Sequence, residues 1–274
     1  MHNYQLCTAQ YTPSFCFTVP QMLEIATLQY DANDSMAGDW TQQDGMSLPF
    51  FRASYIEAVE AIQHIGFKWW KNKVPDYSQA KMELIDILHF AVSDLLRESA
   101  FSVVQAALIS EDSKSYPVTF YHIGRMTGFE HMGTLSEPTL DGEILAPKLP
   151  GSENYRIHDI QNMDFNDLCE QLIFSSLMDG VTKVRILYCL FEHLEMDADE
   201  VHALFIGKNA LNQFRTANGQ KKDDYPKIWD GREDNEHLSE FIEENLRTGP
   251  PLKYADVYDF LVGRFSVINK FEKK

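Results

Sequence analysis

Residues 50–97 read FFRASYIEAVEAIQHIGFKWWKNKVPDYSQAKMELIDILHFAVSDLLR, and this stretch decides the fold. Its apolar periodicity predicts two consecutive helices, the first over about Phe50 to Lys68. The second starts near Ser78, a residue type that suits a helix N-cap, and runs to about Leu108. From Leu84 to Leu96 this second helix is apolar nearly all round. We therefore expect it to lie at the centre of the core.

Each predicted helix carries two carboxylates three residues apart, Glu57 with Glu60 and Glu83 with Asp86. Residues at this spacing share one helix face. No Lys or Arg lies three or four positions away, so we expect four unpaired carboxylates, which are costly to bury. A bound Mg²⁺ would offset this cost of burial, since it binds carboxylate oxygens. The alternative is that the carboxylates lie on solvated helix faces. The surrounding residues are apolar: Tyr55, Ile56, Val59, Ile62, Leu84, Ile85, Ile87 and Leu88.

The composition narrows the class of protein. The chain has 274 residues, 44% of them hydrophobic, and a formal net charge of -17. An acidic chain is poorly suited to bind nucleic acid or an anionic membrane. The four cysteines show no C-x-x-C spacing, and no apolar run approaches the roughly 20 residues that span a bilayer. We expect no signal peptide, because the N-terminus lacks a charged start and an apolar core. We expect a cytoplasmic protein with reduced cysteines.

A helix that begins near Pro20 and ends near Asn33 precedes the two acidic helices. Gln29 and Asn33 share one face of it, and each amide offers a hydrogen-bond donor and an acceptor. That chemistry suits the edge of a pyrimidine base, although two exposed polar residues near a helix end would have the same spacing. The linker between the acidic helices contains Trp69, Trp70 and Lys71. Its tryptophans suit either the core or a ligand.

The second half of the chain is also predicted to be helical. Residues 110–163 form a long irregular insertion, a length that suits a mobile lobe or lid. Helices follow over about 164–179, 181–194, 198–217, 234–247 and 254–270, the third opened by Asp197-x-x-Glu200. The fold class is all-α, a helical bundle with a metal-binding four-helix core. We expect a single catalytic domain over residues 1–274.

A basic segment interrupts the acidic chain between residues 208 and 227. Lys208, Asn212 and Arg215 share one predicted helix face, and Asn218-Gly219 forms a turn after it. Basic groups on a helix and its following loop suit a polyphosphate. The alternative is a solvated patch paired with nearby acids. The other basic residues are Lys221, Lys222 and Lys227, and the nearby acids are Asp223, Asp224 and Asp230.

Together these motifs resemble the all-α nucleoside triphosphate pyrophosphatases, and among them the dimeric dUTPases. No P-loop or G-x-G-x-x-G motif is present. The resemblance covers about residues 20–105 and 165–245. It rests on Gln29 with Asn33, the two acidic pairs, the Phe67–Lys71 linker, Lys208–Arg215, Asn218-Gly219, Tyr225, Lys227, Trp229, Gly231 and Glu233-Asp234-Asn235.

The resemblance implies Mg²⁺-dependent hydrolysis of dUTP to dUMP and pyrophosphate by a metal-activated water, in a homodimer. It implies that Glu57, Glu60, Glu83 and Asp86 hold the metal and that Glu60 also orients or deprotonates the water. Gln29 and Asn33 would read uracil, with Trp69 or Trp70 and Lys71 beside the base. Asn212 would reach the sugar or the α-phosphate. The expected phosphate ligands are Lys208, Arg215, Lys221, Tyr225 and Lys227.

Three alternatives stay open at this point. One is a related pyrophosphatase that acts on dCTP or other nucleotides, because carboxylates and lysines do not identify a base. The second is a ferritin-like di-iron protein, suggested by Asp86-x-x-His89. Such sites need Glu-x-x-His on two helices, which the first acidic helix lacks, so we interpret His89 as a core or supporting residue. The third is a nucleotide sensor without activity, although all four carboxylates are present.

Overall fold

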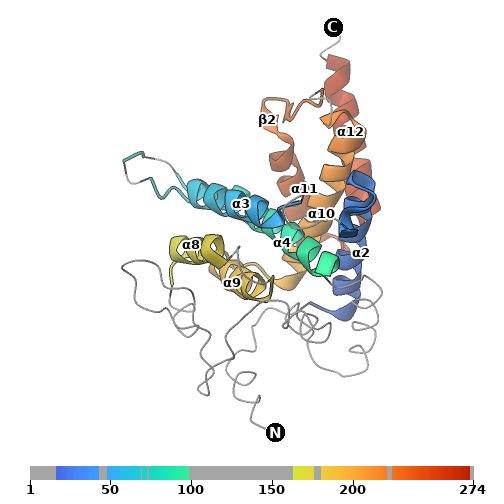
Figure 1. Cartoon of the computed structure of the whole chain (residues 1–274). Coiled ribbons are helices and arrows are strands. Elements are labelled where there is room, and N and C mark those ends of the chain that lie inside the picture. The colour runs from blue at the N-terminus through green and yellow to red at the C-terminus, as the bar shows by residue number, and fades with distance from the viewer. Residues whose placement is uncertain are drawn as a thin grey trace, which may run out of the picture.

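The structure is a computed structural model that describes residues 17–42, 48–68, 70–72, 74–98, 163–175, 180–220 and 224–271 (Figure 1). Within these ranges it contains helices and one short hairpin, which confirms the all-α class. The elements are α2 (Val19–Met36), the 3₁₀-helix η1 (Trp40–Gln42), α3 (Phe50–His64), α4 (Tyr77–Glu98), α8 (Phe165–Ser175), α9 (Gly180–His193), α10 (Ala198–Ala217), β1 (Ile228–Trp229), β2 (Arg232–Glu233), α11 (Asp234–Thr248) and α12 (Tyr254–Phe271).

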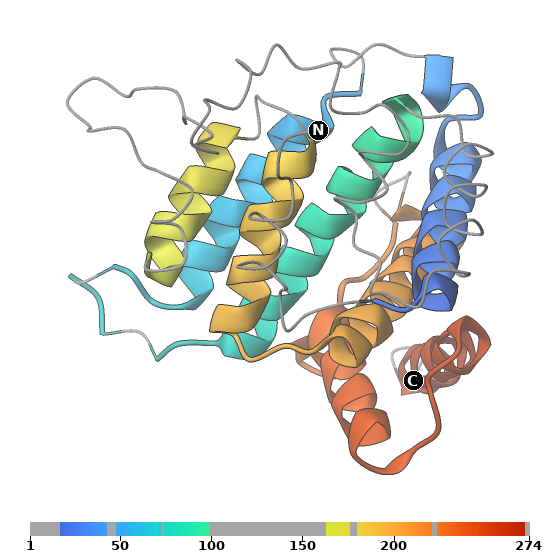
Figure 2. The ribbon, with the colours of Figure 1, turned by 90° about the horizontal axis from the view of Figure 1, so that it is seen from below.

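Four helices form a closed ring in which α3 packs against α4, α4 against α9, α9 against α8, and α8 against α3 (Figure 2). Helix α4 also packs against α2, α10 and α11 outside the ring, so it lies between two layers of helices. Leu84, Ile85, Ile87 and Leu88 are each 0% exposed. The expected central position of α4 is therefore confirmed.

Helix α3 begins at Phe50 as predicted, but the end of α3 and the start of α4 differ from the predicted residues. Helix α3 ends at His64 rather than Lys68, because Gly66 adopts a positive φ of 80°, which a right-handed helix cannot continue. Helix α4 begins at Tyr77, and the carboxylate of Asp76 accepts from the backbone N–H of Gln79 at 3.1 Å. Asp76 is the N-cap, so the choice of Ser78 was wrong. The predicted end at Leu108 lies outside the described residues.

Other predicted helix starts are confirmed by their caps. Thr18 and Gln21 form a capping box before α2, which has Pro20 in its first turn. Asp197 accepts from the backbone N–H of Glu200 at 2.8 Å and caps α10. Both caps bind backbone N–H groups that a helix start leaves without partners. These two helices, which carry Gln29 and Lys208, pack against each other and against α4.

Gly207 allows α11 to approach α10 closely. A Cβ atom at this position would lie 2.4 Å from Cδ1 of Ile242 in α11. The turn of the β1–β2 hairpin, at Asp230 and Gly231 with φ of 52° and 81°, precedes α11. This arrangement brings the N-terminus of α11 beside the basic face of α10.

The predicted insertion at residues 110–163 lies outside the described residues, apart from Met163, which is buried. None of the helices described is both long and apolar enough to cross a membrane.

Candidate active site

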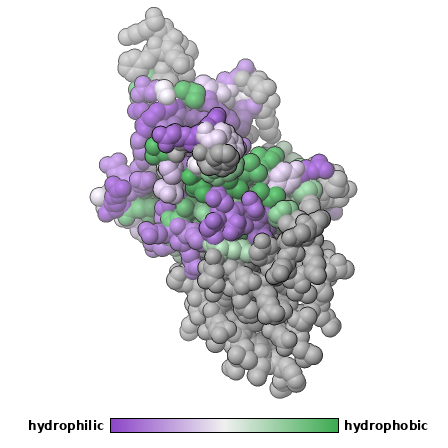
Figure 3. Space-filling model, turned by 90° about the vertical axis from the view of Figure 1, so that its left-hand side faces the viewer, coloured by the Kyte–Doolittle hydropathy of each residue, from purple (hydrophilic) through white to green (hydrophobic). Residues whose placement is uncertain are grey.

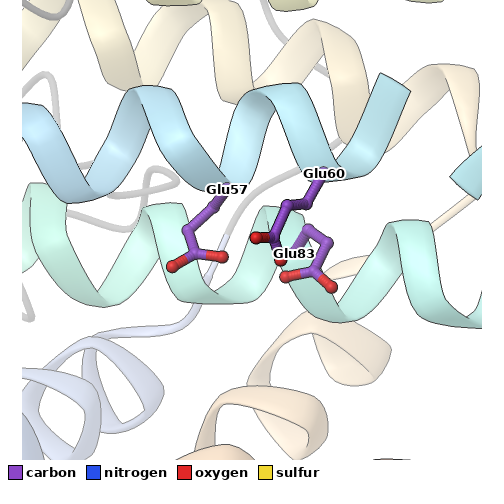
Figure 4. A group of neighbouring side chains, drawn as sticks. All are labelled: Glu57, Glu60 and Glu83. Carbon is purple, nitrogen blue, oxygen red and sulfur yellow. The ribbon is translucent and has the colours of Figure 1, made fainter. Parts of the chain in front are cut away.

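Three carboxylates converge between α3 and α4. Glu57 and Glu60 point from α3 toward Glu83 of α4 (Figure 4). One carboxylate oxygen from each lies within 4.8 Å of the other two, a spacing that suits a shared metal ion. Glu83 is buried, Glu57 is partly buried and Glu60 is exposed. In the described ranges, no other group of three potential ligands comes together in this way.

Asp86, the fourth predicted ligand, already has a basic partner. Its Oδ2 lies 2.8 Å from Nζ of Lys208 in α10. In addition, Nε2 of His64 lies 3.4 Å from Oε1 of Glu83. The expectation of four unpaired carboxylates was therefore wrong, because the partner of Asp86 is 122 positions away along the chain (208 minus 86) and Glu83 meets the far end of α3.

The electrostatics of the cluster favour protonation. Burial, together with the negative charges of Asp86 and Glu60, raises the pKa of Glu57 to about 7. Burial also raises the pKa of Glu83 to about 8, again with contributions from Asp86 and Glu57, while Lys208 opposes the shift. Glu57 and Glu83 are hydrogen-bonded to each other. Without another cation, this pair therefore holds a proton near neutral pH.

The surroundings of the acidic pair on α3 are less apolar than expected. Ile62 is buried, but Ile56 and Val59 are 48% and 42% exposed. The other buried side chains of α3 are Ser54, Ala58 and Ala61.

The basic face of α10 is buried rather than solvated. Lys208 is 3% exposed, and its Nζ also donates to Oδ1 of Asn235 at 3.2 Å. Arg215 donates to both carboxylate oxygens of Asp234, at 2.9 and 2.6 Å, and Tyr225 donates its hydroxyl to the same carboxylate at 2.8 Å. Burial, with the charge of Asp234, raises the pKa of Tyr225, so its hydroxyl stays protonated.

Among the described residues, neither Asp224 nor Asp230 forms an ion pair with Lys208 or Arg215. Asp230 pairs with Arg264 at 3.4 Å, Asp224 is exposed, and Asp223 lies outside the described residues. The partner is Asp234, the first residue of α11, which is 0% exposed. Its role was missed, although it belongs to the Glu233-Asp234-Asn235 motif, because the contact depends on the packing of α11 against α10.

An aromatic cluster supports the loop after α10. The ring of Tyr225 stacks on Phe265 of α12, with centroids 5.8 Å apart. Phe214 and Trp229 each contact both of these rings. Helix α12 therefore holds Tyr225 against Asp234, a role that the sequence did not reveal.

Gln29 and Asn33 are 5% and 4% exposed, so they are not exposed polar residues at a helix end. They hydrogen-bond to each other and to Ser93 of α4. Nδ1 of His89 lies 3.0 Å from Oε1 of Gln29. Burial lowers the pKa of His89 to about 4, so its ring is neutral. The four residues form a buried polar network between α2 and α4.

The remaining predicted residues that the structure describes are Trp70, Lys71, Asn212 and Lys227. Trp70 is 57% exposed, with its ring 6.0 Å from that of Phe67. Lys71 and Lys227 are exposed, and Asn212 is partly buried beside Arg215. Trp69 and Lys221 lie outside the described residues.

The geometry does not fit a ferritin-like di-iron site. Within the described part of the ring, α3 and α4 supply the cluster, whereas α8 and α9 add no ligand to it. His89 faces Gln29 through Nδ1, as a supporting residue would. Of the four helices expected to form a metal-binding core, two therefore contribute to the carboxylate cluster, and Lys208, the partner of Asp86, comes from α10 outside the ring.

A carboxylate cluster able to hold a divalent cation lies next to a buried basic helix face, an arrangement that suits a hydrolase acting on nucleoside triphosphates. A sequence model of the family described as dUTPase matches residues 21–220, more than half of the chain. The chain belongs to this dUTPase family. No curated protein matches it. The matched region runs from the third residue of α2 to just past the end of α10, whereas Asp234 and Phe265 lie beyond it.

Proposed function

We propose that the protein hydrolyses dUTP to dUMP and pyrophosphate with Mg²⁺ as its cofactor. One observation carries this proposal: carboxylates of α3 and α4 converge, and Lys208 of α10 pairs with Asp86, which is one turn after Glu83 on α4. Hydrolysis of a triphosphate needs a cation held by carboxylates and basic groups that bind phosphate oxygens. The family match supports dUTP as the substrate.

Glu57, Glu60, Glu83 and Asp86 would hold the metal ion. When bound, Mg²⁺ neutralises phosphate charge and lowers the pKa of a water molecule. Glu60 is the exposed member of the convergent group, so its carboxylate can reach a water molecule from solvent. We assign to it the orientation or deprotonation of this water, with Glu57 as its neighbour in the same role.

Lys208 would exchange partners when substrate binds. Its ammonium group is bonded to Asp86 and Asn235, so it is already positioned at the edge of the carboxylate cluster. A metal ion on Asp86 would free this ammonium group for a phosphate oxygen. The ammonium group of Lys208 would then bind the phosphate as a point charge.

The other assignments follow the family resemblance. Asn212 would reach the sugar or α-phosphate, and Arg215, Lys221, Tyr225 and Lys227 the phosphates. For Arg215 and Tyr225, the bonds to Asp234 add a positioning role. Gln29 and Asn33 would read the uracil edge, with Trp69 or Trp70 and Lys71 near the base.

A panel of nucleotides tests the substrate. We expect kcat/KM for dUTP to exceed that for dCTP, dTTP, dATP, dGTP and UTP, with Mg²⁺ present in each assay. Similar values for dUTP and dCTP would replace this proposal with the broader pyrimidine-nucleotide pyrophosphatase. Absence of turnover with every nucleotide would favour a sensor without activity.

Mg²⁺ affinity is expected to rise with pH between about 6 and 8. The pKa values of Glu57 and Glu83 are raised to about 7 and 8, so metal binding at pH 6 must displace protons. Affinity should then rise up to about tenfold per pH unit for each proton displaced. Isothermal titration calorimetry in buffers of different ionisation enthalpy measures both affinity and proton release. A Mg²⁺ affinity that stays constant over this pH range would contradict the raised pKa values of Glu57 and Glu83.

Stability without metal should have the opposite pH dependence. Because both pKa values are higher in the folded protein than in the unfolded chain, the folded state binds more protons. Their contribution is therefore fully present below the ordinary carboxyl pKa and is lost as the pH rises through about 7 to 8. Chemical unfolding with a chelator should give a free energy that falls between pH 5 and pH 8, and saturating Mg²⁺ should reduce this fall.

We also propose a homodimer, as the family resemblance implies. Ile56 and Val59 of α3 and Phe174 of α8 are large apolar side chains that are at least 40% exposed, and α3 and α8 pack against each other. Figure 3 shows hydrophobic surface between hydrophilic areas on one side of the molecule. Exposed apolar residues gathered on adjacent elements support a protein interface.

The double substitution Ile56→Asp with Val59→Asp is expected to give a monomer, because two charges would be buried without partners in the proposed interface. Sedimentation velocity measures the change. Val262→Asp on α12 is the matched control, since Val262 is 46% exposed. A wild-type monomer would contradict the dimer, and a dimeric double variant would place the interface elsewhere.

A further inference from the structure

We propose that Ser93 is a positioning residue that fixes the amide orientations of Gln29 and Asn33 and so makes the site select uracil over cytosine. This inference rests on the proposed dUTPase function. Ser93 lies on α4 and is 0% exposed. It does not need to touch the nucleotide, because it acts through the two amides.

The hydroxyl of Ser93 has its single proton committed. It donates to the backbone carbonyl of His89, one turn earlier in α4, at 2.8 Å. The hydroxyl oxygen can then act only as an acceptor, and it accepts hydrogen bonds from Nε2 of Gln29 and Nδ2 of Asn33, each at 2.9 Å. Both amides must therefore present nitrogen to Ser93.

The rest of the network agrees with this orientation. Nε2 of Gln29 gives its second proton to Oδ1 of Asn33 at 3.0 Å. The carbonyl of Gln29 faces Nδ1 of His89 at 3.0 Å, so this ring nitrogen carries the proton. A flip of either amide would place its carbonyl oxygen against the oxygen of Ser93, and two acceptors without a proton between them repel each other. The orientation is thus fixed by four buried hydrogen bonds rather than by the base.

The remaining hydrogen-bonding capacity belongs mainly to Asn33. Both protons of the Gln29 amide are used, whereas Asn33 retains one N–H and one lone pair on Oδ1. Uracil presents a donor at N3 and an acceptor at C4, and cytosine presents the reverse pattern. A freely flipping amide matches either base, but an amide of fixed orientation matches one. We assign the fixed orientation to uracil because the chain belongs to the dUTPase family.

The main test compares kcat/KM for dUTP and dCTP in wild type and in Ser93→Ala. We expect the dUTP/dCTP ratio to fall by about tenfold or more, mostly through weaker use of dUTP. Ser93→Thr, which keeps the hydroxyl, should retain most of the ratio. Ser54→Ala is the matched control: Ser54 is also 0% exposed and also donates to the carbonyl one turn earlier, that of Phe50, at 3.0 Å. Its ratio should stay within about twofold of wild type.

The outcomes separate this inference from the proposed function. Wild-type protein that turns over neither nucleotide, or both equally, contradicts dUTP specificity itself. A wild type selective for dUTP with an unchanged ratio in folded Ser93→Ala overturns the role of Ser93 alone.

A second measurement needs neither activity nor the Ala variant. The network predicts that His89 carries its proton on Nδ1, the less common tautomer of a free imidazole. Ring ¹⁵N shifts of histidine-labelled wild-type protein, assigned by comparison with His89→Gln, report this directly. An Nε2–H tautomer would overturn the fixed orientation of Gln29.

Discussion

Glu60→Gln is expected to lower kcat for dUTP by about a thousandfold or more. Glutamine keeps the size of the side chain but removes its charge and its ability to accept a proton, and general base catalysis alone contributes about 10² to 10⁴-fold. Glu60 is also one of three carboxylates that converge within 4.8 Å, so metal binding weakens as well. A discontinuous assay for pyrophosphate over hours provides the necessary range.

The fold should tolerate this substitution, because Glu60 is exposed. We expect the free energy of unfolding to change by less than about 0.5 kcal/mol. Glu244→Gln is the matched control, since Glu244 is an exposed glutamate on α11 outside the acidic cluster. A Glu60→Gln protein that keeps more than a tenth of the wild-type kcat would show that another residue activates the water.

Asp234→Leu is expected to destabilise the protein by about 3 to 5 kcal/mol, because it leaves Arg215 buried without its carboxylate. Asp234 is 0% exposed and receives two bonds from Arg215 and one from Tyr225. For a protein of this size the loss corresponds to a fall in Tm of about 6 to 20 °C. Differential scanning calorimetry at fixed protein concentration measures it.

The double variant Arg215→Met with Asp234→Leu separates the ion pair from general packing. Removing both charges should restore at least half of the lost stability, since no buried charge then lacks a partner. Glu240→Leu is the control, because Glu240 also binds an arginine, Arg232, but at an exposed position, and its loss should be clearly smaller. Equal losses in the single and double variants would show that packing, not the charge of Arg215, dominates.

The acidic half of the site could be predicted because its geometry is local. Residues at i and i+3 share a helix face whatever surrounds them, so Glu57 and Glu60 were placed together from spacing alone. Glu83 joined them because consecutive helices connected by a short linker pack side by side. The apolar run of α4 likewise predicted its central position.

The partners of these residues could not be predicted, because they come from packing between distant segments. Lys208 meets Asp86 only where α10 crosses α4, and Asp234 meets Arg215 only where α11 starts beside α10. Ser93 gave no signal, since a serine within an apolar helix is ordinary until its amide partners on α2 are known. Sequence spacing identifies groups on one helix, whereas the tertiary contacts determine which charges neutralise one another.

The most direct test is product analysis of purified wild-type protein incubated with dUTP, with Mg²⁺ and with a chelator. We predict dUMP and pyrophosphate in equal amounts when Mg²⁺ is present, and neither product when it is removed. Release of dUDP with inorganic phosphate, or unchanged turnover in the chelator, would contradict a metal-dependent pyrophosphatase built on Glu57, Glu60, Glu83 and Asp86.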